Sequence, residues 1–129
     1  MYFVLVMLFA CLIQVEVYAT TEKMYQIAAD CMDSTHVDPD EVAISLSGTV
    51  TDSPEFKQFL ECFFETVGFL HDNVIDFDAI LLHLDYLEPV FPHIEDLSAA
   101  VLICKEKMVH GSTMADTIFS GFKCFVGAA

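Results

Sequence analysis

The sequence of 129 residues has no Trp, only four Pro and five Gly, and only five basic residues, all of them Lys. Nucleic acids and anionic membranes are bound through Lys and Arg, which displace the counterions of phosphate groups. A chain with 20 acidic residues and a formal net charge of −15 is poorly suited to either partner. The strand-like alternation of apolar and polar residues is also nearly absent. The chief candidate strand, residues 42–50, is short and interrupted by Gly48.

The sequence lacks the short motifs that carry most catalytic and metal chemistry. There is no Gly-rich phosphate loop and no His-Glu-x-x-His motif. No cysteines are paired as Cys-x-x-Cys, the spacing that zinc sites use. Residues 72–78 are rich in Asp and Asn but lack the central Gly and the terminal Glu of an EF-hand. We therefore predict a protein that is not an enzyme, with no catalytic residue, no metal and no cofactor.

The N-terminal residues have the layout of a cleaved secretory signal. The apolar run of residues 1–13 is too short to span a bilayer, and small or aliphatic residues occupy the −3 and −1 positions of a cut after Ala19. We expect residues 1–19 to be a signal peptide and residues 20–129 to form one secreted extracellular domain, without stable membrane insertion. There are two alternatives. One is a retained anchor helix, which Glu16 disfavours, and the other is a bacterial lipoprotein signal cleaved before Cys11.

Helical spacing of apolar residues recurs along the rest of the chain. Its strongest instance begins after Ser53 and Pro54, a favourable N-cap and first position, and ends at Gly68. Between them, Phe56, Phe59, Leu60, Phe63, Phe64 and Val67 share one helix face. Further helices are expected at residues 21–32, 38–46, 76–84, 92–109 and 113–125. The pattern predicts an all-α domain of about six short helices.

Four cysteines follow the predicted signal peptide: Cys31, Cys62, Cys104 and Cys124. An even number of cysteines in a small secreted chain predicts a disulfide framework, and four cysteines allow three pairings. Each cysteine lies on the apolar side of its expected helix. Bridges between helices are therefore expected, and their connectivity stays open at this point.

The cysteine spacing resembles that of the insect odorant-binding and pheromone-binding family. In the segment 62–68 a cysteine precedes a glycine by six residues, as around the family's third cysteine. The interval from there to Cys104 suits the third-to-fourth spacing, and the surroundings of Cys124 are similar to those of the sixth cysteine. The family's second and fifth cysteines, which form one bridge, would fall at Gln58 and Ala115. The chain therefore resembles the four-cysteine, or minus-C, subgroup.

The resemblance implies short helices around an apolar cavity, held together by two disulfides, Cys31–Cys62 and Cys104–Cys124. It implies a secreted carrier for small hydrophobic ligands such as odorants, pheromones and fatty or aromatic semiochemicals, with a membrane odorant receptor as a candidate partner. We expect a monomer or a weak dimer. Because no bridge ties the third helix to the sixth, we also expect these two helices to separate more easily.

The domain contains more Phe than a core of this size needs, and by the resemblance some of these rings line the ligand pocket. We predict a pocket formed by Phe59, Phe63, Leu81, Leu84, Met114, Phe119 and Phe122. Gln58 and Thr66 are candidates for a polar contact, although either would also suit the surface. Ordinary core packing is the alternative for each apolar residue.

Two other functions fit the same residues. One is a secreted helical interaction or signalling protein, such as a venom component, whose apolar side chains fill a core and leave no pocket. The other is the same carrier fold in a role outside smell, which only the tissue of expression would distinguish. Uptake of a small apolar probe separates a carrier from a filled core.

Overall fold

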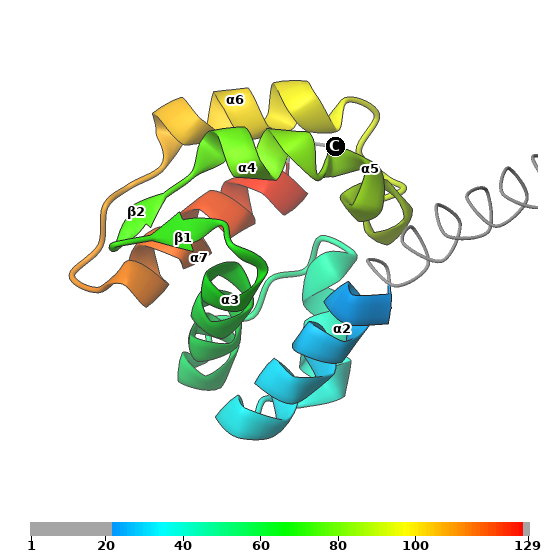
Figure 1. Ribbon diagram of the computed structural model, residues 1–129, viewed down its shortest axis with the longest axis vertical. Coiled ribbons are helices and arrows are strands. Elements are labelled where there is room, and N and C mark those ends of the chain that lie inside the picture. Colours follow the sequence, from blue (N-terminus) through cyan, green and yellow to red (C-terminus); the bar gives the residue numbers. More distant parts are fainter. Residues whose placement is uncertain (1–21, 128–129) are drawn as a thin grey trace, which may run out of the picture.

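The computed structural model describes residues 22–127 and consists of short helices with one small hairpin (Figure 1). The predicted signal peptide, residues 1–19, lies outside the described residues. The helices are that of residues 22–35, α2 (Pro39–Leu46), α3 (Pro54–Val67), α4 (Phe77–Leu82), α5 (Leu84–Leu87), the 3₁₀ helix η1 (Glu88–Val90), α6 (Leu97–Lys107) and α7 (Met114–Val126). The predicted all-α class is confirmed.

Polar side chains determine where the helices begin. The Ser53 hydroxyl accepts a hydrogen bond from the Phe56 N–H at 3.1 Å, and Pro54 occupies the first turn of α3. The Asp38 carboxylate likewise accepts from the Asp40 N–H at the start of α2. Such caps satisfy amide groups that have no partner within the helix. At the other end of α3, Gly68 has a φ of 101°, a left-handed conformation that glycine adopts without strain.

Three expected helices have different bounds. The first, expected over residues 21–32, continues to residue 35. The helix expected from Pro92 begins only at Leu97, because the Asp96 carboxylate accepts from the Ala99 N–H at 3.0 Å and caps the helix there. The helix expected over residues 76–84 ends at Leu82, and a single further turn, α5, follows. Between them His83 leaves the helical conformation, with φ −108° and ψ 15°.

A short antiparallel hairpin was not anticipated from the sequence. Its strands are β1 (Leu70–His71) and β2 (Val74–Ile75), joined by Asp72 and Asn73 at φ values of 50° and 62°. Asp and Asn tolerate this left-handed conformation, which two-residue hairpin turns require. Strands of two residues are too short to produce an alternating pattern. The stretch considered for a strand, residues 42–50, instead begins within α2.

The helices form two groups that face one another across the interior. In Figure 1, α6 lies beside α4 at the top with α7 crossing beneath them, whereas α3, the helix of residues 22–35 and α2 lie below. Phe56 of α3 is fully buried, with its ring centroid 5.5 Å from that of Phe122 on α7. A second apolar cluster around Phe69, Ile80 and Val101 packs α4 against α6 and the hairpin. The core therefore extends along the length of the apolar face of α3.

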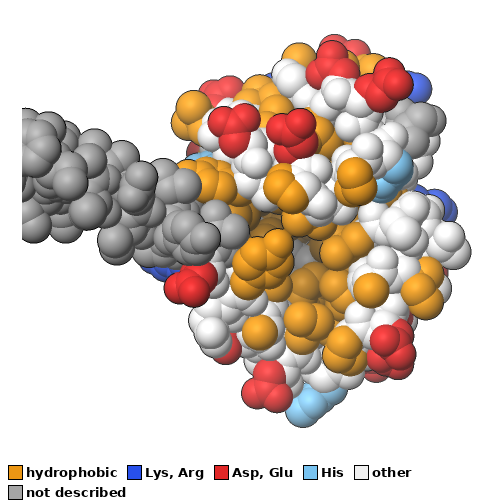
Figure 2. All heavy atoms as spheres, turned by 90° about the vertical axis from the view of Figure 1, so that its right-hand side faces the viewer, with side chains coloured by type: hydrophobic (Ala, Val, Ile, Leu, Met, Phe, Trp, Pro, Cys, Tyr) orange, Lys and Arg blue, Asp and Glu red, His pale blue; other side chains and the backbone are white. Residues whose placement is uncertain are grey.

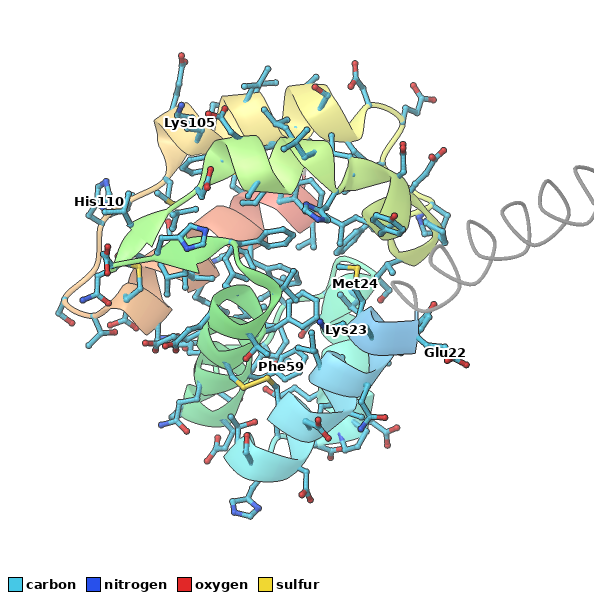
Figure 3. The ribbon with its side chains drawn as sticks, viewed as in Figure 1. Glu22, Lys23, Met24, Phe59, Lys105 and His110 are labelled. Carbon is cyan, nitrogen blue, oxygen red and sulfur yellow. A yellow bond between two sulfur atoms is a disulfide. The ribbon has the colours of Figure 1, made fainter. Side chains whose placement is uncertain are left out.

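Two disulfides join the helices. Cys31–Cys62 links the helix of residues 22–35 to α3 (Figure 3), and Cys104–Cys124 links α6 to α7. These are the pairings that the family resemblance implied. They connect one pair of helices within each group, so neither bridge joins α3 to α7.

Candidate ligand-binding site

A cavity of about 400 Å³ lies between the helices. Its wall is formed by side chains from the helix of residues 22–35, α2, α3, the hairpin, α4 to η1, α6 and α7. Ligand pockets in proteins usually range from about 300 to 1,000 Å³, and they are lined mainly by apolar and aromatic side chains. The cavity is therefore large enough for a small organic molecule.

Eight phenylalanines make up the aromatic part of the wall: Phe59, Phe63, Phe64, Phe69, Phe77, Phe91, Phe122 and Phe125. Many of these rings also contact one another. Phe91 meets Phe125 edge to face at 5.0 Å, and Phe64 meets Phe69 in the same way at 5.6 Å. Such contacts hold the rings in defined orientations. These contacts between rings of the wall therefore set the shape of the cavity.

The cavity opens on the side of the molecule where α5 and the beginning of the first described helix lie. Figure 2 shows this face, with a hollow surrounded by hydrophobic side chains and acidic side chains further out. Tyr25, whose surface is 64% exposed, and the α5 residues Asp85 and Tyr86 are lining residues with polar side chains. Met24 lines the cavity from the first helix, and Phe59 does so from α3 (Figure 3).

Three of the residues predicted for the pocket line this cavity. Phe59 and Phe63 reach it from α3, and Phe122 reaches it from α7. They are on the helix faces that the apolar spacing selected. Their contact with a ligand is a separate matter and remains a prediction.

Four other predicted residues do not line the cavity but pack in the apolar core. Leu81 packs against the cluster around Phe69, Met114 and Phe119 pack against the cluster around Phe56, and Leu84 packs against both. The structure directs these side chains toward neighbouring helices. Helix spacing identifies an inward face, but it does not tell which inward residues meet a neighbour and which meet an empty space.

The candidates for a polar contact, Gln58 and Thr66, are both exposed on α3 and lie outside the cavity. Several lining residues were missed. Met24 and Met32 come from the first helix, and Leu87, Val90 and Phe91 come from the chain around η1. The one available signal was that the segment 87–91 is strongly apolar although Pro89 disfavours a continuous helix there.

The contact between α3 and α7 includes a half-buried ion pair. Lys57 Nζ lies 3.1 Å from Asp116 Oδ1 and 3.1 Å from Asp52 Oδ1, and 5.0 Å from the centroid of the Phe119 ring. Its hydrogen bonds to Asp116 and Asp52 raise the pKa of Lys57 above the ordinary 10.5. Hydrogen bonds with Lys57, Thr113 and Ser112 lower the pKa of Asp116 below the ordinary 3.8. This cluster connects the two helices that no disulfide joins.

The described part of the chain has neither a cluster of metal-binding side chains nor a membrane-spanning helix. Residues 22–127 contain no group of three or more His, Cys, Asp or Glu side chains arranged to hold a metal ion. Within the same range, no helix has the length and apolar character needed to cross a membrane.

A solved structure with a similar fold is the fatty acid binding protein OBP56a from the oral disk of the blowfly Phormia regina. The similarity has a TM-score of 0.54 at 25% sequence identity, and it covers 83% of this chain and 89% of the blowfly chain. No curated protein matches the chain significantly by sequence.

The sequence pattern of the PBP/GOBP family matches residues 15–128, which is nearly the whole chain. This family match, the blowfly structure and the apolar cavity together support a carrier of small ligands. On the extent of the match, the chain belongs to the PBP/GOBP family.

Proposed function

We propose that this protein is a secreted carrier that binds small hydrophobic ligands, such as odorants, pheromones or fatty compounds, and transports them through extracellular fluid. The observation that carries the proposal is the apolar cavity of about 400 Å³. A ligand of suitable shape would exchange contact with water for contact with the phenylalanine wall, which yields roughly 25 cal/mol for each Å² of apolar surface buried.

Secretion is part of the proposal. The N-terminal residues have the layout of a signal peptide, and two disulfides are typical of proteins that fold in an oxidising compartment. The formal net charge of −15 favours repulsion between copies in a concentrated fluid. Mass spectrometry of the secreted product would test whether it begins at Thr20.

The four-cysteine pattern leads us to place the chain in the minus-C subgroup. Gln58 and Ala115 stand where the resemblance would put the missing cysteine pair, and the Lys57–Asp116 ion pair lies beside both positions. In this proposal, polar contacts and packing hold α3 against α7 in place of a covalent bond.

The rival proposal, an interaction protein with a filled core, requires that no small molecule enters. The two differ in a direct test: titration of the oxidised domain, residues 20–129, with the fluorescent dye N-phenyl-1-naphthylamine. We expect saturable binding near one dye per chain, followed by displacement with some members of a panel of volatile and fatty ligands. The same protein with its disulfides reduced and unfolded in urea serves as the control for nonspecific uptake.

Absence of saturable binding by folded protein with both disulfides intact would reject the carrier and favour the interaction protein. Binding of the dye would leave the biological role open between smell and another secretion. The tissue in which the protein is made would then distinguish these roles.

A further inference from the structure

The polar groups of the cavity wall are few and none is cationic. Among the described residues that line it, only Tyr25, Asp85 and Tyr86 have polar side-chain groups, and Asp85 alone is charged at neutral pH. No Lys, Arg or His is a member of this lining. Residues 1–21 and 128–129, outside the described range, contain no Lys, Arg or His either.

The lysines of the protein are committed elsewhere or lie at the surface. Lys57 is paired with acidic residues between α3 and α7. Lys105 lies at the end of α6 away from α5 (Figure 3), where its Nζ is 5.3 Å from the centroid of the Phe77 ring. Lys23 precedes the lining residue Met24 in sequence but is exposed and outside the lining. Lys23 and the α-amino group of a chain that begins at Thr20 are the cations whose contribution an experiment has to examine.

Two histidines contact aromatic rings that line the cavity. His83 Nδ1 is 2.7 Å from the Ala79 carbonyl oxygen, and its ring contacts those of Phe69 and Tyr86. His93 similarly approaches a carbonyl oxygen of α7 at 3.3 Å and meets the Phe91 ring at 6.4 Å. Neither His83 nor His93 lines the cavity, although each ring contacts the ring of a lining residue. Glu88, which stands between the lining residues Leu87 and Pro89, is exposed and adds a second acidic side chain to this segment.

A carboxylate placed against this wall would lose water without gaining a cationic partner. Burial of an unpaired charge is strongly unfavourable and shifts the equilibrium toward the neutral form. The acidic residues at the opening add repulsion for an anion. An alcohol, aldehyde or ester of the same alkyl length loses much less hydration free energy on burial. It has no net charge, and its oxygen requires only one hydrogen bond.

We propose that the cavity selects uncharged amphiphiles, such as alcohols, aldehydes and esters, and discriminates against ionised fatty acids. The inference rests on the proposed carrier function and specifies its ligand class. The blowfly protein is named as a fatty acid binding protein. The proposed selectivity would therefore distinguish this chain from it.

The test is displacement of the naphthylamine dye from the oxidised domain by four ligands with the same alkyl chain: 1-decanol, methyl decanoate, decanoic acid and 1-decanesulfonate. At pH 7.5 we expect decanol and the ester to bind at least tenfold more tightly than decanoic acid. A fatty acid with a pKa near that of Glu, about 4.3, is neutral in only about one molecule in a thousand at this pH, which sets the upper bound of the difference. The acid should approach the alcohol as the pH falls to 5, while decanol changes less than twofold and the sulfonate stays weak throughout.

Variants at the opening sharpen the test. Asp85→Lys places a cation beside the cavity and should strengthen decanoate binding at pH 7.5 at least fivefold relative to decanol. Glu106→Lys makes the same charge change on the exposed surface of α6, outside the lining, and should alter the ratio less than twofold. If the lysine variant does not fold, Asp85→Asn takes its place. This smaller change should shift the ratio of decanoate affinity to decanol affinity in the same direction.

The outcomes separate the two proposals. If neither dye nor decanol binds, the carrier function itself fails. If decanol binds and decanoic acid binds equally well at pH 7.5, the selectivity proposal is overturned, and loss of acid binding in Lys23→Gln would identify the missed anchor. A sulfonate that gains affinity as steeply as decanoic acid between pH 7.5 and pH 5 would also overturn it, because the gain would then come from groups of the protein and not from protonation of the ligand.

Discussion

Installing a disulfide between α3 and α7 would test what the absence of a third bridge does to this protein. Gln58 on α3 and Ala115 on α7 are the chain neighbours of Lys57 and Asp116, whose Nζ and Oδ1 atoms are 3.1 Å apart. The two helices therefore meet at the level where the bridge would be placed. We expect the double substitution Gln58→Cys and Ala115→Cys to form a disulfide spontaneously in oxidising buffer.

The expected stabilisation follows from the length of the closed loop. The new bridge would enclose about 58 residues, for which chain entropy gives an upper value of about 4.2 kcal/mol at 25 °C. Engineered bridges often give less because they distort the native structure, so we expect a gain in unfolding free energy of about 2–4 kcal/mol. Since α3 and α7 both contribute to the cavity wall, we also expect the dye to dissociate at least threefold more slowly.

Urea denaturation measures the gain, with the two single-cysteine variants, Gln58→Cys and Ala115→Cys, as matched controls. Mass spectrometry verifies the bridge, and stopped-flow fluorescence gives the dissociation rate of the dye. If the bridge forms but neither dye affinity nor exchange rate changes, relative movement of α3 and α7 does not control access to the cavity. If the cysteines stay reduced in folded protein, the placement of these two positions opposite each other is wrong.

Three further predictions concern the cavity, a native bridge and the ion pair. Ala28→Phe adds a ring to the cavity wall; because a cavity of about 150 Å³ holds one benzene molecule, the ring would take more than a third of the 400 Å³ available. Dye affinity should fall at least tenfold while circular dichroism stays unchanged, and unaltered affinity would place the binding site elsewhere. The double substitution Cys104→Ala and Cys124→Ala should lower the unfolding free energy in urea by about 3.3 kcal/mol, and a loss below about 1 kcal/mol would contradict the loop-entropy argument. Lys57→Met should lower Tm at pH 7, because Asp116, with its lowered pKa, stabilises the fold above pH 3.8, and Lys57, with its raised pKa, does so below pH 10.5. The Tm difference from wild type should shrink below pH 3.8 and in about 1 M NaCl, and a constant difference would show that lost packing of the lysine stem is responsible.

Most of the helical framework could be read from the sequence because its signals are local. Ser53, Pro54 and Gly68 mark the ends of α3, and they act through hydrogen bonds and backbone conformations within a few residues. The spacing of the phenylalanines between them identifies the buried face for the same reason. Cysteine spacing, through a family resemblance, anticipated both disulfides.

Where several local signals compete, the sequence was a poorer guide. Asp96 and Pro92 both suit the start of a helix, and the hydrogen bond from the Ala99 N–H to Asp96 determines where α6 begins. Asp72 and Asn73 form a tight turn, but the two-residue strands beside it leave no periodic pattern. The predicted signal peptide, residues 1–19, stays a prediction.

The sequence alone determined the helical class, the inward faces and the excess of aromatic side chains, since each depends on residue type and on spacing along one helix. Only the tertiary structure decided which inward residues border empty space. Phe59 and Phe119 both point inward from amphipathic helices, yet one lines the cavity and the other packs against Phe56 and Lys57. The crossing of helices distant in sequence separates them, because a cavity is what remains when side chains from several elements fail to meet.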